Sequence, residues 1–457
     1  DGGYRLHYRA ADYHLIAESD DGFNWTKPEF GAVEFEGSTS NNIIAGSGEH
    51  YFEDPSAPPA ERFKLMRMTG GLYDAERDSD GNFLPYEGTS EKAKALIAEG
   101  GDVGQVDTFD LQESPATRMT YRDKWVQLKG FLAGSVSSDG IHFKELDEPF
   151  LPEWVDGDNL VSYDEELGKY VGYLRFHLAG RRCVGISYSD DFRTFTPEQV
   201  VLQIDSADPP QDSFYNHSYT RYPGRNDLHT MFVSIFHQDT GLIDIQLAVS
   251  HDGLQWDRPN RTRPIIPNGP EGSQDSGCIY VAPDLLELPD GRYAIAYSGR
   301  LKRHVEGVGE TTDDIYRQGI IRYVTWERDR LAGIRARQLG SFTLRQDRYR
   351  RPEDCPDSIE VPPFDRFPPV ADPNEPPRQL RLNYRCELGG WIKAELIPLI
   401  GPMTHPQIDA LDGYSFEDCD VMSGNELDKV VTWKGNDNIA RLSDTMAVRI
   451  EMYRTTL

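Results

Sequence analysis

The sequence predicts an all-β protein, a five-bladed β-propeller followed by a C-terminal β-sandwich, and three observations lead to this fold class. A motif with the frame Ser-x-Asp-Gly-x-x-aromatic recurs at Ser19, Ser137, Ser189 and Ser250. The last three copies lie 52 and 61 residues apart, and periods of that size are typical of propellers and solenoids. The 30 prolines, 41 glycines and many aromatic residues of the chain suit short strands joined by turns.

Each copy of the motif follows a short apolar run, such as residues 14–17 before Ser19. An apolar strand, a tight Asp-Gly turn and a returning aromatic residue describe the outer hairpin of a four-stranded blade. The alternative is a set of unrelated surface hairpins, which the recurrence of one frame disfavours. The expected strands, blade by blade, are 4–9, 14–17 and 32–35; 51–54, 62–66, 125–129 and 131–136; 159–163, 169–175, 183–188 and 200–204; 216–221, 229–236 and 243–249; 276–282, 292–297 and 319–326.

Two departures from a regular blade pattern are expected. The chain begins at a hairpin turn, so the first blade is incomplete at its N-terminus and lacks its innermost strand. A polar, acidic insertion spans residues 70–115, with a short helical stretch at 90–99. Long loops in compact domains are usually functional, so we expect this insertion to lie at the pocket end of the propeller and to narrow the pocket.

The texture of the sequence changes near residue 340. Residues 341–378 are rich in Pro, Asp and Arg, which is typical of a connector. Segments 379–386, 391–397, 429–433 and 447–453 then alternate between apolar and polar residues and predict a small β-sandwich. The predicted domains are therefore a propeller over 1–340, the connector over 341–378 and a sandwich over 379–457.

Composition excludes several classes of partner. The net charge of −28 disfavours nucleic acid, which needs a basic face, and it also disfavours anionic membranes. No apolar run of membrane-spanning length is present. We expect a secreted or periplasmic protein whose signal is not present in this chain, and the oligomeric state stays open. The cysteines lack zinc-site spacing; we expect Cys183 and Cys278 to be buried thiols, and one disulfide among the other three stays open.

Acidic residues stand before the innermost strands of three successive blades, where the blades of a propeller converge on one axis. They are Asp158, Asp212 and Asp275. Carboxylates that share a pocket repel each other, so at least one pKa rises and an acid stands beside an ionised base or nucleophile, as glycoside hydrolysis requires. The alternative is that each Asp caps a strand start through an Asx turn. Polar and aromatic neighbours, expected to bind sugar, are Asn159, Tyr215, Asn216, His217 and Tyr280.

Basic residues gather near the same rim in the sequence. They are Arg175, His177, Arg181, Arg182, Arg300, Arg303 and His304. In a protein this acidic, we expect Arg175, Arg181 and His304 to contact the substrate, where arginine can clamp a carboxylate or sulfate; ion pairing with surface acids is the alternative. Glu306, in the Gly-rich loop over 300–314, is the candidate general acid.

Four groups of residues carry a family resemblance. They are residues 19–28 with Asn41-Asn42, residues 54–59 with Arg62, residues 275–280, and residues 413–420 with 431–435. In these the chain resembles the five-bladed propeller glycosidases of the invertase and arabinanase type, glycoside hydrolase families 32 and 43, and more closely an uncharacterised bacterial group similar to family 32. The resemblance implies the propeller-and-sandwich fold and glycosidase activity, with the three central acids of the family matched loosely by Asp158, Asp212 and Asp275.

The chain also departs from this family pattern. The Trp-Met-Asn-Asp-Pro and Arg-Asp-Pro motifs of the invertases are absent, and Glu417-Asp-Cys419, which is similar to their Glu-Cys acid, falls in the C-terminal domain. Family 43 enzymes often hold a calcium on the axis near a His. His217 is similarly placed, so a structural calcium there is left open, and no other metal or cofactor is expected.

We therefore expect a glycoside hydrolase that cleaves a plant or algal polysaccharide or oligosaccharide. One of Asp158, Asp212 and Asp275 would act as base or nucleophile, another would support the transition state, and Glu306 would be the acid. A non-catalytic carbohydrate-binding propeller is the alternative. A polysaccharide lyase that uses Tyr215, His217 and Arg181 is a third reading. The sugar, its linkage and the stereochemical outcome stay open.

Overall fold

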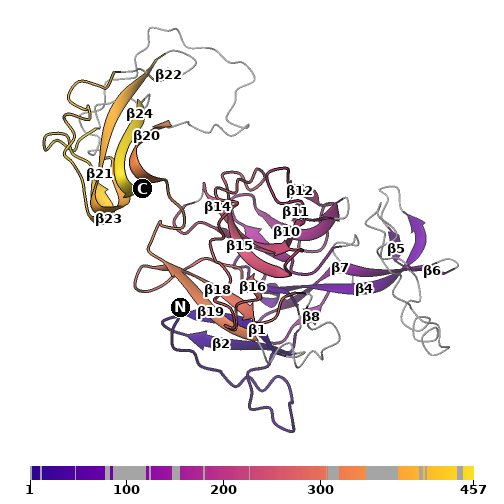
Figure 1. Ribbon diagram of the computed structural model, residues 1–457. Coiled ribbons are helices and arrows are strands. Elements are labelled where there is room, and N and C mark those ends of the chain that lie inside the picture. Colours follow the sequence, from indigo (N-terminus) through magenta and orange to yellow (C-terminus); the bar gives the residue numbers. More distant parts are fainter. Residues whose placement is uncertain are drawn as a thin grey trace. The chain divides into compact units, whose positions relative to one another are not determined.

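The computed structural model describes residues 3–10, 13–46, 48–77, 83–85, 120–122, 125–146, 155–178, 181–225, 227–304, 306, 319–345, 379–400, 405–406, 409–439 and 446–457. The all-β prediction is confirmed: these residues form 24 strands and one 3-10 turn, η1 (Pro59–Glu61) (Figure 1). No sheet closes on itself within the described strands. The chain divides into two compact units, Asp1–Trp326 and Glu327–Leu457.

Most strands of the first unit follow the predicted order, with two corrections. Residues 32–35 form no strand, only an isolated bridge between Phe35 and Ser38, and the two strands expected at 125–129 and 131–136 are one continuous strand. One sheet pairs β1 (Tyr4–Ala10) with β2 (Tyr13–Ser19); a second runs β3 (His50–Glu53), β4 (Phe63–Arg77), β7 (Trp125–Ser137), β6 (Thr120–Arg122), with β5 (Phe83–Pro85) on β4 and β8 (Lys144–Glu145) on β7. A third runs β12 (Gln199–Leu202), β11 (Arg181–Ser189), β10 (Lys169–Leu178), β9 (Leu160–Asp164). The fourth runs β13 (Asp212–Arg221), β14 (His229–His237), β15 (Leu242–Ser250), β16 (Cys278–Val281), β18 (Tyr293–Arg300), β17 (Leu286–Glu287), with β19 (Gly319–Trp326) on β18.

The repeated motif forms the turn that its sequence predicts. At Ser250 the hydroxyl accepts from the Gly253 N–H at 2.9 Å, and Asp252 accepts from the next two backbone N–H groups at 2.9 and 2.8 Å. The chain then returns, because Val249 and Asp257 exchange backbone hydrogen bonds. In the copy at Ser189, Phe192 adopts the left-handed conformation (φ 58°) that glycine adopts elsewhere; its ring is fully buried, and this burial offsets the strain.

The sheets of the first unit pack on one another through their apolar faces. A buried cluster joins the third sheet to β13–β15 and includes Tyr173, Met231 and Val233. The first and fourth sheets of the unit also meet, since the Tyr4 hydroxyl of β1 donates to the Glu287 carbonyl of β17 at 2.8 Å, and Trp25, which follows β2, stacks on Tyr323 of β19. Segments that are distant in sequence therefore come together around the middle of the unit.

The predicted insertion begins later than residue 70. β4 continues to Arg77 and β7 begins at Trp125. The pairing of these two strands continues past a register shift between Thr69 and Gly70 (Figure 1). The absence of strand expected from residue 70 is therefore wrong for residues 70–77, where backbone pairing overrides a polar, Gly-containing sequence. The helical stretch at 90–99, and with it most of the segment expected at the pocket, lies outside the described residues.

The second unit is built on one long strand. β21 (Arg381–Ile400) pairs with β24 (Met446–Thr456), β22 (His405–Pro406) and β23 (Asn425–Val430), and β24 also pairs with β20 (Arg335–Arg345). The predicted boundary at residue 340 lies within β20. The two strands expected over 379–397 are one strand, because Leu388–Gly390 form an irregularity inside the pairing with β24 rather than a turn. The core of this unit surrounds Trp433, whose indole N–H donates to the Ala394 carbonyl at 2.9 Å.

The described cysteines are all free thiols: Cys183, Cys278, Cys386 and Cys419. Cys183 and Cys278 are buried, as predicted. Cys355 lies outside the described residues.

Candidate active site

A cavity of about 670 Å³ lies in the first unit, within the size range of small-ligand sites. Its walls come from β1, from the segments that precede β3 and β9, from the turn after β16, and from β18 and β19. Three kinds of side chain dominate the lining: the acids Glu49, Asp156, Asp158 and Asp284; the aromatic residues Tyr4, Tyr8, Trp25, Tyr51 and Tyr323; and the histidines His7, His14 and His50.

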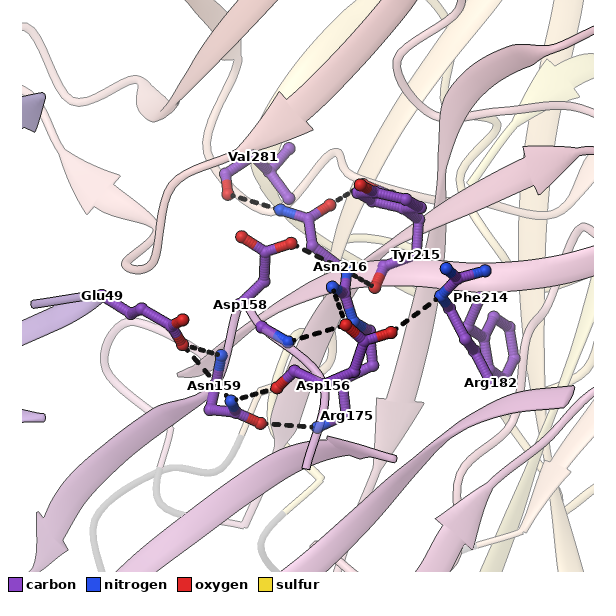
Figure 2. A network of polar contacts seen from close by, with 12 residues as sticks. Glu49, Asp156, Asp158, Asn159, Arg175, Arg182, Phe214, Tyr215, Asn216 and Val281 are labelled. Atoms are coloured by element: carbon purple, nitrogen blue, oxygen red, sulfur yellow. Dashed lines mark hydrogen bonds and ion pairs between the residues drawn. The ribbon is translucent and has the colours of Figure 1, made fainter. Parts of the chain in front are cut away.

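Glu49 stands directly before β3, where its backbone N–H donates to the Met66 carbonyl of β4 at 2.8 Å. Its carboxyl group accepts from the backbone and side-chain amides of Asn159 at 3.1 and 3.3 Å (Figure 2). Glu49 is exposed to solvent in the cavity, although protein atoms crowd around its carboxyl group. Burial, with the nearby charge of Asp158, raises the pKa of Glu49 from 4.5 to about 7. Glu49 can therefore hold a proton near neutral pH.

Asp156 and Asp158 both precede β9, and both pair with Arg175 of β10. The Arg175 guanidinium donates to Asp158 at 2.8 Å and to Asp156 at 2.9 Å, while Arg182 donates to Asp156 at 3.0 Å (Figure 2). Burial alone would raise the pKa of Asp156, but the two arginines outweigh it and hold this pKa at about 2. Asp158 takes a left-handed backbone conformation (φ 64°), which Asp tolerates better than most residues. The side chain of Asp158 is 48% exposed, so an ion-paired carboxylate faces the cavity.

Asn159 connects these groups from a buried position. Its side-chain amide donates to the Asp156 carbonyl at 2.6 Å and to Glu49, and its oxygen accepts from the Arg175 N–H at 2.8 Å. With both ends of the amide occupied, Asn159 fixes the acids and the arginine relative to one another. Asn159 therefore acts by positioning Glu49 and Arg175.

Asp284 brings a further carboxyl group from the turn after β16. It follows Pro283 in a left-handed conformation (φ 72°), and burial among the cavity walls raises its pKa. Its exposed surface faces the cavity. Within the described part of the chain its carboxyl has no hydrogen-bonding partner.

Of the acids predicted from the sequence, Asp158 lines the cavity and the other three do not. Asp212 is buried against His237 at 3.0 Å. Asp275 accepts from Tyr297 at 2.9 Å and from Arg322 at 2.8 Å. Glu306 is exposed and accepts from the Arg303 N–H at 3.0 Å. The two buried Asp residues are thus held by fixed donors, closer to the strand-cap alternative than to a catalytic pair.

Of the residues predicted to bind substrate, some line the cavity and others do not. Arg175 lines the cavity, whereas Arg181 is exposed at the start of β11. A register shift in β13 falls at Tyr215 and Asn216; bulges of this kind re-aim side chains next to functional sites. Here the Tyr215 carbonyl accepts from Arg175, and the buried Asn216 amide accepts from Ser234.

His217 and the remaining candidates lie away from the cavity lining. Burial lowers the pKa of His217 to about 4, and its Nε2 lies 2.9 Å from the Tyr173 carbonyl. Tyr280 and His304 both contact the ring of Tyr215. Tyr215, Tyr280 and His304 thus form an aromatic group, which Arg175 contacts through the ring of Tyr215.

Sequence reasoning missed Glu49, Asp284 and the aromatic wall. A signal for Glu49 was present, because Glu49-His50 stands at the start of β3 as Asp158-Asn159 stands at the start of β9. For Asp284 the sequence offers only an Ala-Pro-Asp turn. The described residues contain no group of three His, Cys, Asp or Glu side chains placed to hold a metal, and the calcium considered near His217 stays a prediction. None of the described segments is a helix long and apolar enough to cross a membrane.

No protein-family model matches the sequence, and no curated protein is significantly similar to it. Among solved structures, one described as a glycoside hydrolase is 13% identical with a TM-score of 0.37, covering 71% of this chain and 88% of its own. A β-1,2-mannobiose phosphorylase from Listeria innocua is 15% identical (TM-score 0.34; 56% and 69% covered). A glycosyl hydrolase from Bacteroides ovatus is also 15% identical (TM-score 0.29; 38% and 52% covered). Likeness at these values carries no argument about this chain.

Proposed function

We propose that the protein is a glycoside hydrolase whose active site is the cavity lined by Glu49, Asp158 and Asp284. The single observation that carries the proposal is the pairing of two unlike carboxyl groups in one cavity. Glu49 has its pKa raised to about 7, next to Asp158 in its ion pair with Arg175. An acid that keeps its proton beside a carboxylate is what glycoside hydrolysis requires.

The roles follow from the environments. Glu49 donates its proton to the leaving glycosidic oxygen. Asp158, held by Arg175, either attacks the anomeric carbon or removes a proton from the water that does so. Asp284, which carries no fixed partner among the described residues, accepts from a sugar hydroxyl or offsets positive charge on the ring. Asn159 keeps Glu49 and Arg175 in place.

The fold proposed with this activity is the predicted one. The sheets of the first unit would be blades of a five-bladed propeller around the cavity, and the second unit would complete a β-sandwich. The support is that segments from every sheet of the first unit line the cavity and that the first and fourth of these sheets meet. An extracellular or periplasmic role on plant or algal glycans stays a prediction.

The cavity lining favours an uncharged sugar at the point of cleavage. Its tyrosines and Trp25 offer flat faces on which sugar rings can stack. Arg175, the arginine in contact with the acids, already serves Asp156 and Asp158. A lyase needs a cation to neutralise a uronate at the reacting carbon. Arg175 is committed to its two acids, Arg5 pairs with Glu18, and Arg9, the third lining arginine, also has a partner. We therefore favour hydrolase activity over lyase activity.

The test is product release from a panel of plant and algal polysaccharides, comparing the wild type with Glu49→Gln and Asp158→Asn. Both substitutions keep size and hydrogen bonding but remove the acid chemistry. The matched control is Glu53→Gln, at an exposed acid paired with Arg62. We expect the two cavity variants to lose turnover by a factor of about 10² to 10⁴ and the control to keep it. Full activity in both cavity variants refutes the assignment; glycan binding without cleavage by the wild type favours a binding module.

A further inference from the structure

A cluster of arginine and aromatic side chains lies beside the cavity and is not used by the proposed chemistry. We call Arg182, Tyr215, Tyr280, Arg300 and His304 the arginine–tyrosine cluster. The Arg182 guanidinium lies 5.3 Å from the centre of the Tyr215 ring, and that of Arg300 lies 5.2 Å from the centre of the Tyr280 ring. The two tyrosine rings are 5.5 Å apart. Figure 2 shows Arg182 and Tyr215 on the side of Asp156 away from Glu49.

His304 sits in the middle of this cluster. Its ring lies 4.7 Å from that of Tyr215 and stacks at 4.7 Å on that of Phe236, and its Nε2 is buried without a hydrogen-bonding partner within the described part of the chain. Burial lowers its pKa, and Arg182, Arg300 and Arg175 lower it further. The imidazole of His304 is therefore neutral, and the charges of three arginines act on it.

Among the described residues, the arginines at and beside the cluster outnumber the acids that pair with them. Asp156 is shared by Arg175 and Arg182, and Asp158 pairs with Arg175. Among the described residues no acid pairs with Arg300, and His237 engages the nearby Asp212 and Asp244. In a chain with a net charge of −28, acids to neutralise an arginine are abundant. A half-buried cation left without one favours an anion from outside.

We propose that the arginine–tyrosine cluster binds an oxyanion carried by the substrate, a carboxylate or sulfate on a sugar ring beside the one in the cavity. This inference rests on the proposed function. The guanidinium fork matches both groups, and a neutral His adds a hydrogen bond. Arg175 connects the cavity with the arginine–tyrosine cluster. It lines the cavity, and its guanidinium lies 4.6 Å from the centre of the Tyr215 ring. The substrate class is then an anionic glycan cleaved next to an uncharged residue.

The test is calorimetric binding to the Glu49→Gln protein, which holds ligand without turnover. The probes are galactotriose, the same trisaccharide with one terminal galactose replaced by galacturonate, and sodium sulfate. We expect the trisaccharide with one terminal galacturonate to bind more tightly than galactotriose, and Arg300→Gln to weaken its binding about tenfold to a hundredfold, as for loss of a charge-assisted hydrogen bond. Arg292→Gln is the matched control, because Arg292 pairs locally with Asp290 and lies outside the cluster. An unchanged melting temperature shows that Arg300→Gln is folded.

Equal affinity for the two trisaccharides, binding of neither, or equal weakening of both by Arg300→Gln overturns the inference. Binding of sodium sulfate alone overturns the assignment to a sugar-borne group. These failures are distinct from failure of the proposed function. A protein that hydrolyses a neutral glycan without charge preference keeps the function and loses the inference. One that binds the galacturonate-bearing trisaccharide through Arg300 but cleaves no glycan keeps the inference and loses the function.

Discussion

Replacing Glu49 by Gln should make the protein more stable at high pH and leave it unchanged at low pH. The folded state holds the Glu49 proton more tightly than the unfolded chain, because the pKa rises from 4.5 to about 7 on folding. The wild type therefore loses stability as the pH rises through this window. The shift is worth about 3 kcal/mol when fully expressed. Since part of the side chain faces water in the cavity, we expect about 1–2 kcal/mol.

Gln carries no charge to desolvate but still accepts from Asn159, so the variant avoids this loss. Urea unfolding followed by tryptophan fluorescence, below pH 4.5 and above pH 7, measures the difference. Glu53→Gln is the control, because Glu53 lies on the surface beside Arg62. An equal effect of Glu49→Gln at both pH values, or destabilisation above pH 7, would show that Glu49 is an ordinary ionised surface acid.

Two further predictions concern the first unit, and one concerns the second unit. Turnover by the wild type should fall as the pH rises above about 7, where Glu49 loses its proton; a rate that keeps rising there in a pH–rate profile contradicts the role of acid. Arg175→Met should cost about 2–4 kcal/mol in thermal unfolding, because it leaves Asp158 without its partner and Asp156 with Arg182 alone, and a loss below about 1 kcal/mol would mean that solvent compensates. Trp433→Phe should cost about 1–3 kcal/mol by denaturation of the second unit, since the buried Ala394 carbonyl loses its donor; an unchanged midpoint refutes this.

The strands could be predicted where alternation and turn chemistry agree. β19 has the bounds that the sequence predicts, and the motif at Ser250 forms its turn because each hydroxyl and carboxylate satisfies a local N–H. The same reasoning failed at Gly389-Gly390, which looks like a hairpin turn. Gly389 does adopt a left-handed conformation (φ 75°), but the pairing of β21 with β24 resumes at Trp391. Tertiary pairing decided what local propensity could not.

The site was only partly predictable, for a reason that Asp158 and Asp275 illustrate. Both stand before an expected inner strand, and nothing in their neighbours separates them. Asp275 meets Arg322, which is distant in sequence, and is fixed, whereas Asp158 keeps an exposed edge beside Arg175. The sequence identifies an acidic residue but does not show which donor contacts that residue in the folded protein. Glu49 was missed because its partner Asn159 comes from another sheet.

The most direct test of the central claim compares leaving groups on the sugar that the polysaccharide panel identifies. Glu49→Gln and the wild type are assayed on the natural linkage and on a dinitrophenyl glycoside of the same sugar, whose departing oxygen needs no proton. If Glu49 is the acid, the variant is slowed by about 10² to 10⁴ on the natural linkage and much less on the activated one. Equal slowing of both substrates, or no cleavage of any glycan by the wild type, would contradict the assignment of this cavity as a hydrolytic site.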